Sequence, residues 1–142
     1  MIKKSKKGFT IIELIVVIAI IAVLAGIVLI NVTQYINKGK NAAIEGNLST
    51  LLTDSATYFD TTTGGTGATF IASSYKSDVS AAITNAGGSL NVFGDPASQA
   101  WCGSSSTLAA GSTPASTFCV DSTGYKGVLG SGKCATGVYT CQ

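Results

Sequence analysis

The sequence predicts an α+β protein in which one long N-terminal α-helix, about residues 9–60, packs against a small antiparallel β-sheet head that disulfides stabilise. Three observations predict this class. A proline-free apolar run turns amphipathic without a break, short β-type segments alternate with Gly-rich turns, and all four cysteines lie in the last 41 of 142 residues. Because the head holds few large apolar side chains, it needs covalent cross-links to be stable.

The first half of the predicted helix is long enough to cross a membrane. Residues 9–30 comprise 22 positions with a single charge, Glu13. At about 1.5 Å per residue they span roughly 33 Å, against ~30 Å of hydrocarbon. The lysines before Gly8 favour a cytoplasmic N-terminus. An ordinary secretory signal is the alternative, but its weak cleavage box, residues 23–25, lies inside the apolar run.

The second half of the helix, residues 31–60, is predicted to lie on the head. Its apolar residues recur mostly at steps of three and four, which is the spacing of one helical face. The cluster of threonine and glycine at residues 61–65 predicts the end of the helix. The apolar face comprises Val32, Ile36, Ile44, Leu48, Leu51, Leu52 and Phe59.

Residues 61–142 are predicted to form the head. A short helix is expected at residues 77–85, and a loop of small residues at 107–116. Trp101 is expected in the core, against a disulfide. Alternating segments between turns predict short strands at 89–93, 117–120, 125–129 and 137–141.

The four cysteines predict two disulfides, because an even number in a Gly/Ser-rich exported segment is typical of a disulfide framework. A zinc site is the alternative. Zinc ligands usually come in close pairs, whereas these cysteines are 17, 15 and 7 positions apart and the chain has no histidine. Four cysteines allow three connectivities, and neighbours in sequence are favoured because they can face each other in hairpins. The favoured pairs are Cys102–Cys119 and Cys134–Cys141.

Charge and residue inventory argue against several functions. Four of the nine lysines precede Gly8, and the remaining 5 lysines against 7 acids give a net charge of −2. Without a basic face, no direct nucleic-acid binding is predicted. The chain has no His, no Arg and no G-x-S-x-G motif, so it is not predicted to be an enzyme. The acids Asp95 and Asp121 are too sparse for calcium, so no metal and no cofactor are predicted.

Residues 6–13, KKGFTIIE, precede the uncharged run and carry a resemblance to a known family. A basic leader, a glycine, an aromatic residue and a glutamate at the fifth position after the glycine resemble the processing and methylation signature of type IV pilins and type II secretion pseudopilins. The resemblance covers about residues 1–60. It implies a pilin-like fold and a prepilin whose leader, residues 1–8, is removed by a prepilin peptidase that cuts between Gly8 and Phe9. The same enzyme is then expected to methylate the Phe9 amine.

The resemblance also implies partners and a location. Residues 9–30 would first sit among membrane lipids, in a single-pass protein of the cytoplasmic (inner) membrane with its head exported. An inner-membrane assembly platform would then move the chain into a filament of identical or related subunits, either a cell-surface pilus or a periplasmic pseudopilus. Many relatives have a helix-breaking proline near the end of the apolar segment, where this chain has Ile30 and Asn31. A kink at that point is therefore not carried over.

Glu13 is the candidate assembly residue. A charged side chain in hydrocarbon costs roughly 2.5–3.5 kcal/mol or more, so Glu13 needs a partner or a proton. The amine that processing would create on Phe9 lies four residues earlier, within reach in one chain. The same pair formed between neighbouring chains would fix their axial register. A protonated, merely tolerated Glu13 is the alternative.

Three functions follow from these features. The first is a structural subunit of a type IV pilus-like filament. The second is a pseudopilin of a type II secretion or DNA-uptake (competence) machine, which shares the N-terminal features. The third, an exported enzyme or binding protein on a membrane anchor, lacks a catalytic set of residues.

Overall fold

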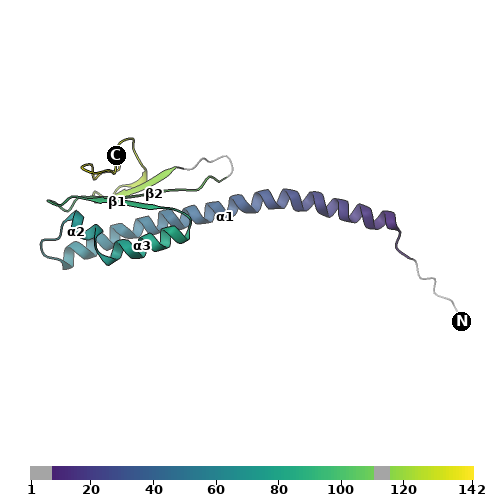
Figure 1. Ribbon diagram of the computed structural model, residues 1–142, viewed down its shortest axis with the longest axis horizontal. Coiled ribbons are helices and arrows are strands. Elements are labelled where there is room, and N and C mark those ends of the chain that lie inside the picture. Colours follow the sequence, from purple (N-terminus) through teal and green to yellow (C-terminus); the bar gives the residue numbers. More distant parts are fainter. Residues whose placement is uncertain (1–7, 111–115) are drawn as a thin grey trace.

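The computed structural model describes residues 8–110 and 116–142, so the predicted leader before Gly8 and part of the predicted loop, 111–115, lie outside the described residues. Helix α1 (Ile11–Thr61) is one continuous helix of 51 residues, and it extends far beyond the head (Figure 1). It ends in the predicted Thr/Gly cluster, where the backbone N–H of Thr62 donates to the carbonyl of Tyr58. The predicted long helix is therefore confirmed.

The head consists of two short helices and one sheet. Helices α2 (Gly67–Ile71) and α3 (Ser74–Asn85) follow α1 directly, and α3 lies alongside the second half of α1 (Figure 1). The sheet is antiparallel with strand order β1-β2-β3-β4. Its strands are β1 (Leu90–Gly94), β2 (Trp101–Ser106), β3 (Thr117–Asp121) and β4 (Lys126–Val128). The α+β class and the small antiparallel sheet are therefore confirmed.

Three parts of the head differ from the prediction. Helix α2 and strand β2 were not predicted, and α3 begins three residues before the predicted Ser77. Strand β2 is WCGSSS, a segment without β-branched residues, and it forms a strand because neighbouring strands pair with both of its edges. The predicted strand at 137–141 is wrong, since Gly137 and Val138 belong to a turn closed by the Ala135–Val138 bridge and residues 139–141 are irregular.

The core lies between the second half of α1 and one face of the sheet. Gly103 on β2 faces this core, because a Cβ there would lie 3.0 Å from a methyl of Leu51 and 3.3 Å from Val92. Glycine thus lets α1 approach the sheet closely. Trp101 is fully buried, and its ring centroid lies 5.1 Å from that of Phe70. The core cluster comprises Ile44, Leu48, Leu51, Phe70, Val79, Ile83, Trp101 and Val120.

The two disulfides lie on the other face of the sheet, away from α1. Since side chains alternate along a strand, Cys102 points opposite to Trp101, and Cys119 points opposite to Val120. All four cysteines form a separate buried cluster with Phe93, Tyr125 and Leu129 around it. The head therefore has an apolar core on one face and a disulfide-linked C-terminal tail on the other, so Trp101 packs against α2 and not against a disulfide.

The disulfide framework is confirmed, but the predicted connectivity is wrong. Cys102 is joined to Cys134 and Cys119 to Cys141, with Cα–Cα distances of 5.6 and 5.9 Å. In the β2–β3 register, Cys102 stands opposite Asp121 and Cys119 opposite Ser104. The predicted partners Cys102 and Cys119 are thus diagonal neighbours, typically about 7–8 Å apart, beyond the usual Cα separation of about 4.4–6.8 Å for a disulfide. The other predicted pair, Cys134–Cys141, is replaced because each of these cysteines bonds to a different strand.

Two asparagines join α1 to the segment after β2. The Asn41 side chain donates to the carbonyl of Leu108 at 2.7 Å and accepts from its N–H at 2.7 Å. One helical turn earlier, Asn37 donates to the carbonyl of Ala109 at 2.8 Å. These contacts mark the end of the head that faces the exposed first half of α1.

The prediction that residues 31–60 lie on the head is correct only from about Asn37 onward. Val32 and Ile36, which were assigned to the apolar face, are 46 and 52 % exposed.

Candidate processing and assembly site

The Gly8–Phe9 peptide bond lies in an exposed, non-helical segment directly before α1. The Phe9 side chain is 77 % exposed, and a Cβ added at Gly8 would meet no atom within 4 Å. Proteases preferentially cut exposed backbone outside regular secondary structure. From Gly8 to Thr10, the described side of the predicted cleavage point, the backbone is exposed and non-helical.

Helix α1 begins with a capping box formed by Thr10 and Glu13. Thr10 is the N-cap, with φ −83° and ψ 151°. Its hydroxyl accepts a hydrogen bond from the Glu13 N–H at 3.3 Å. The Glu13 carboxylate in turn accepts from the Thr10 N–H and from the Thr10 hydroxyl, both at 2.8 Å. Helix-terminal N–H groups that would lack a partner are thus satisfied inside the chain.

The capping box changes the environment expected for Glu13. Two donors of Thr10 reach one oxygen of the carboxylate, Oε2. A negative charge in the first turn also interacts favourably with the helix dipole. The precursor chain therefore offers Glu13 a partner before any amine exists at Phe9. The role of Thr10 was not predicted, although the sequence Thr10-Ile11-Ile12-Glu13 matches the T-x-x-E capping-box pattern.

The first half of α1 makes no contact that buries its side chains. All large apolar side chains from Ile11 to Leu29 are 45 to 77 % exposed, and α1 is the one helix among the described residues that is long and apolar enough to cross a membrane. A shallow apolar hollow of about 310 Å³ lies between Ala19, Ile20, Val23 and Leu24. An apolar surface of this kind needs lipid or other helices around it.

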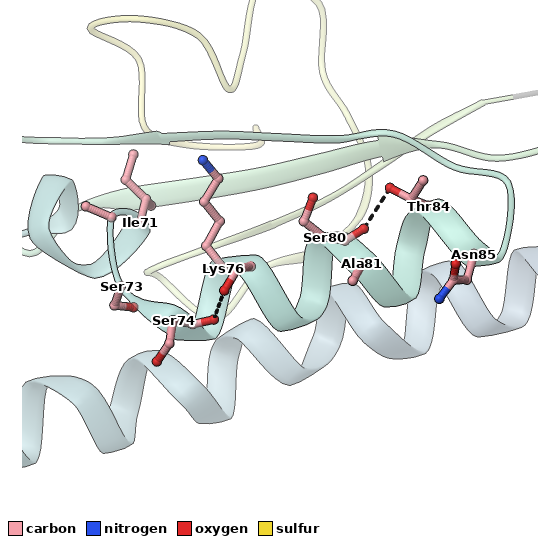
Figure 2. A pocket seen from close by; sticks show the side chains of 10 residues that line it. Ile71, Ser73, Ser74, Lys76, Ser80, Ala81, Thr84 and Asn85 are labelled. Carbon is pink, nitrogen blue, oxygen red and sulfur yellow. Dashed lines mark hydrogen bonds between the residues drawn. The ribbon is translucent and has the colours of Figure 1, made fainter.

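A shallow cavity of about 780 Å³ runs along α3, and Figure 2 shows its lining residues. Two hydroxyl groups of the lining donate to backbone carbonyls of the same helix. The Ser77 hydroxyl donates to the carbonyl of Ser74 at 2.7 Å, and the Thr84 hydroxyl donates to that of Ser80 at 2.8 Å. Lys76 is the charged residue in the lining. No hydroxyl of the lining is arranged with a base, as a nucleophile would need to be.

Two acids meet where α3 packs on α1. Burial and, to a smaller extent, the Asp78 carboxylate raise the pKa of Asp54 above its ordinary value. The two carboxylates come from different helices, so their repulsion acts across the α1–α3 contact. Within residues 8–110 and 116–142, no three His, Cys, Asp or Glu side chains are arranged to hold a metal ion.

The comparison with protein families gives one match. Residues 3–29 match the family model described as the prokaryotic N-terminal methylation motif. The matched segment contains Gly8, Phe9, the Thr10–Glu13 capping box and the exposed part of α1 up to Leu29. Neither the curated proteins nor the solved structures gave a match. The head, residues 61–142, lies outside the matched segment.

Proposed function

We propose that the chain is a structural subunit of a type IV pilus-like filament, because its methylation motif and its long N-terminal helix are those of a type IV pilin-like prepilin. In this proposal the precursor is cleaved between Gly8 and Phe9, methylated on the Phe9 amine and polymerised through the first half of α1. The motif implies processing by a prepilin peptidase and assembly into a pilin-type filament. It also points to a structural subunit and not to an enzyme.

The observation that carries the proposal is the division of α1 into a bare half and a covered half. From Ile11 to Leu29, the bare half, the helix is exposed and, apart from Glu13, apolar on every side. Such a helix is stable in lipid or inside a bundle of similar helices. The same surface can therefore serve the membrane-inserted precursor and the filament, and the subunit needs no refolding to pass from one to the other.

Glu13 fixes the axial register at which two neighbouring helices pack. Repeated Val, Ile and Leu side chains adhere well, but sliding one helix along another exchanges one apolar contact for a similar one. A carboxylate inside the bundle is costly wherever it lacks a partner. Cleavage creates a cationic amine at Phe9, next to Thr10, the residue that already holds Glu13. The amine of a neighbouring subunit meets Glu13 at one axial offset, and this offset sets the register.

The remaining partners follow from the same scheme. The precursor is a single-pass protein of the cytoplasmic membrane with its head outside. An assembly platform in that membrane extracts the processed subunit into the filament. The head then forms the filament surface, where the two disulfides stabilise it in an oxidising environment.

The test is to delete the gene and restore it with the full-length chain. Electron microscopy of sheared cell-surface material, labelled with an antibody against the head, is expected to show filaments that disappear on deletion and return on complementation. Loss of protein secretion or DNA uptake with no surface filaments in the parent cells would replace the pilus with a pseudopilus. A head found only as membrane-bound monomer in the parent cells, without any such defect, would contradict both.

A further inference from the structure

Asp121 is a buried carboxylate at the end of β3, with 1 % of its surface exposed. Its Oδ1 accepts hydrogen bonds from the N–H and the hydroxyl of Thr123, at 2.9 and 2.5 Å. Its Oδ2 accepts from the backbone N–H of Cys141 at 2.8 Å. One oxygen therefore closes the turn after β3, and the other holds the C-terminal tail.

The position of Asp121 relates it directly to the disulfides. Cys102 stands opposite Asp121 in the β2–β3 pairing. Cys119 lies two residues before Asp121 on the same strand, so both point to the same face of the sheet. A tail residue whose N–H is held by Asp121 is thereby placed beside Cys119, and the structure joins Cys119 to that residue, Cys141.

The tail itself favours a different disulfide. Cys134 and Cys141 are seven positions apart, whereas Cys119 and Cys141 are separated by 22. The tail also folds back on itself, since the N–H of Cys134 donates to the carbonyl of Thr140 at 2.8 Å. Because closing a short loop costs less chain entropy than closing a long one, the Cys134–Cys141 bond is the entropically favoured competitor of the observed pairing.

We propose that Asp121 is a positioning residue for oxidative folding: its carboxylate captures the Cys141 N–H in the reduced head and directs the Cys141 thiol to Cys119 and away from Cys134. A buried carboxylate supplies this selectivity because it is costly when it loses a donor. Pairing of Cys119 with Cys141 then leaves Cys102 and Cys134 to form the second bond. The proposal concerns the folding of the head and stands whichever filament the chain forms.

The chemical step requires an oxidant of the disulfide class. The thiolate of one cysteine attacks a sulfur of the oxidant and releases one oxidant thiol. The second cysteine thiolate then attacks this mixed disulfide and releases the other oxidant thiol. The two cysteine sulfurs lose two electrons in total, the oxidant disulfide gains them, and the two thiol protons end on the released thiols.

The test uses the full-length chain in detergent micelles, reduced and denatured, then refolded with reduced and oxidised glutathione. Digestion with trypsin and chymotrypsin separates all four cysteines, because cleavage after Phe118, Lys126, Lys133 and Tyr139 leaves one cysteine on each peptide. Mass spectrometry of the unreduced digest then gives the ratio of Cys134–Cys141 to Cys119–Cys141. In Asp121→Asn we expect this ratio to rise about tenfold over the native sequence, since hydrogen bonds to charged groups contribute at least that factor.

Two control variants separate this role from general stabilisation. Thr123→Val removes a donor to Oδ1 and leaves the contact of Oδ2 with Cys141, so its ratio should stay native. Asp95→Asn alters an exposed carboxylate that accepts from Ala97 and Ser98 and touches no cysteine, and it should also keep the native ratio. Because mapping counts every isomer whether or not the head is folded, a poorly folding variant still gives a result. An unchanged ratio in Asp121→Asn, or an equal rise in Thr123→Val, would overturn the proposal.

Discussion

The two halves of α1 belong to one unbroken helix but have opposite relations to the rest of the chain. In the first half, a residue such as Ile20 is 54 % exposed, whereas Leu48 in the second half is completely buried. The difference lies in the sequence pattern, since the first half is apolar on all sides and the second on one face. A helix with one apolar face is completed by its own head, whereas a helix that is apolar all round needs a partner outside the chain.

The largest expected effect comes from the single charge in the bare half. Glu13→Ala should leave the protein in the membrane fraction unchanged or increased, because a charge in hydrocarbon costs about 2.5–3.5 kcal/mol. Filament yield should fall about tenfold or more, as a loss above 1.4 kcal/mol in each subunit contact implies. Glu13→Gln should also assemble few filaments, since glutamine keeps the shape of the side chain and loses its charge. Sheared filaments and membrane-fraction protein are measured separately in cells that lack the native subunit.

Glu45→Gln is the matched control for this experiment, because Glu45 lies in the second half of α1, outside the apolar run. It should assemble normally. A normal filament yield from Glu13→Ala would show that the register comes from contacts between heads.

Truncation of one apolar side chain in each half tests the division directly. Leu48→Ala should lower the free energy of unfolding of the head by about 2–5 kcal/mol, the usual cost of a cavity in a packed core. Ile20→Ala should change it by less than about 0.5 kcal/mol. Both are measured by urea unfolding of the full chain in micelles, followed by the fluorescence of Trp101. A loss for Ile20→Ala as large as that for Leu48→Ala would mean that the first half also supports the head.

The boundary between the halves can be probed at Asn41. Asn41→Ala leaves the N–H and the carbonyl of Leu108 without the partners they have on α1. It should lower the free energy of unfolding of the head by about 1–3 kcal/mol. Asn37→Ala breaks one exposed hydrogen bond and should lower it less, by about 0.5–1.5 kcal/mol. Hydrogen exchange of the Leu108 amide should accelerate in Asn41→Ala only. Equal acceleration in both variants would contradict a specific role for Asn41.

The smallest effect is expected at the contact between Asp54 and Asp78. The pKa of Asp54 is raised in the folded head by burial and then by Asp78, so the folded state binds a proton more tightly than the unfolded chain. The free energy of unfolding therefore falls as the pH rises through the raised pKa, and the contribution of Asp54 to it is least favourable above that pKa. Asp54→Asn should stabilise the head at neutral pH by a few tenths of a kcal/mol, after allowance for solvent screening. The gain should disappear below the ordinary carboxyl pKa, and a gain that persists there would have another cause.

The sequence predicted the regular parts of the molecule better than the head. The periodicity of residues 31–60 and the Thr/Gly stop placed α1 correctly, because helical spacing is a local signal. Strand β2 was not predicted, since Gly103 and the serines after it have low β propensity. They form a strand because they pair with β1 and β3. The disulfide pairing depends on the β2–β3 register, which is a long-range property. At the N-terminus, the T-x-x-E pattern would have predicted the Thr10–Glu13 capping box. The charge of Glu13 led only to the prediction of a partner at Phe9.

In the proposed function, the bare half of α1 is retained, processed at its start and packed into a filament. The most direct measurement is the intact mass of the head-bearing chain recovered from sheared cell-surface material. The account predicts a chain that begins at Phe9, carries one added methyl group and contains two disulfides. A chain that begins after residues 23–25 would lack most of the bare half, make the segment an ordinary secretory signal and contradict the account.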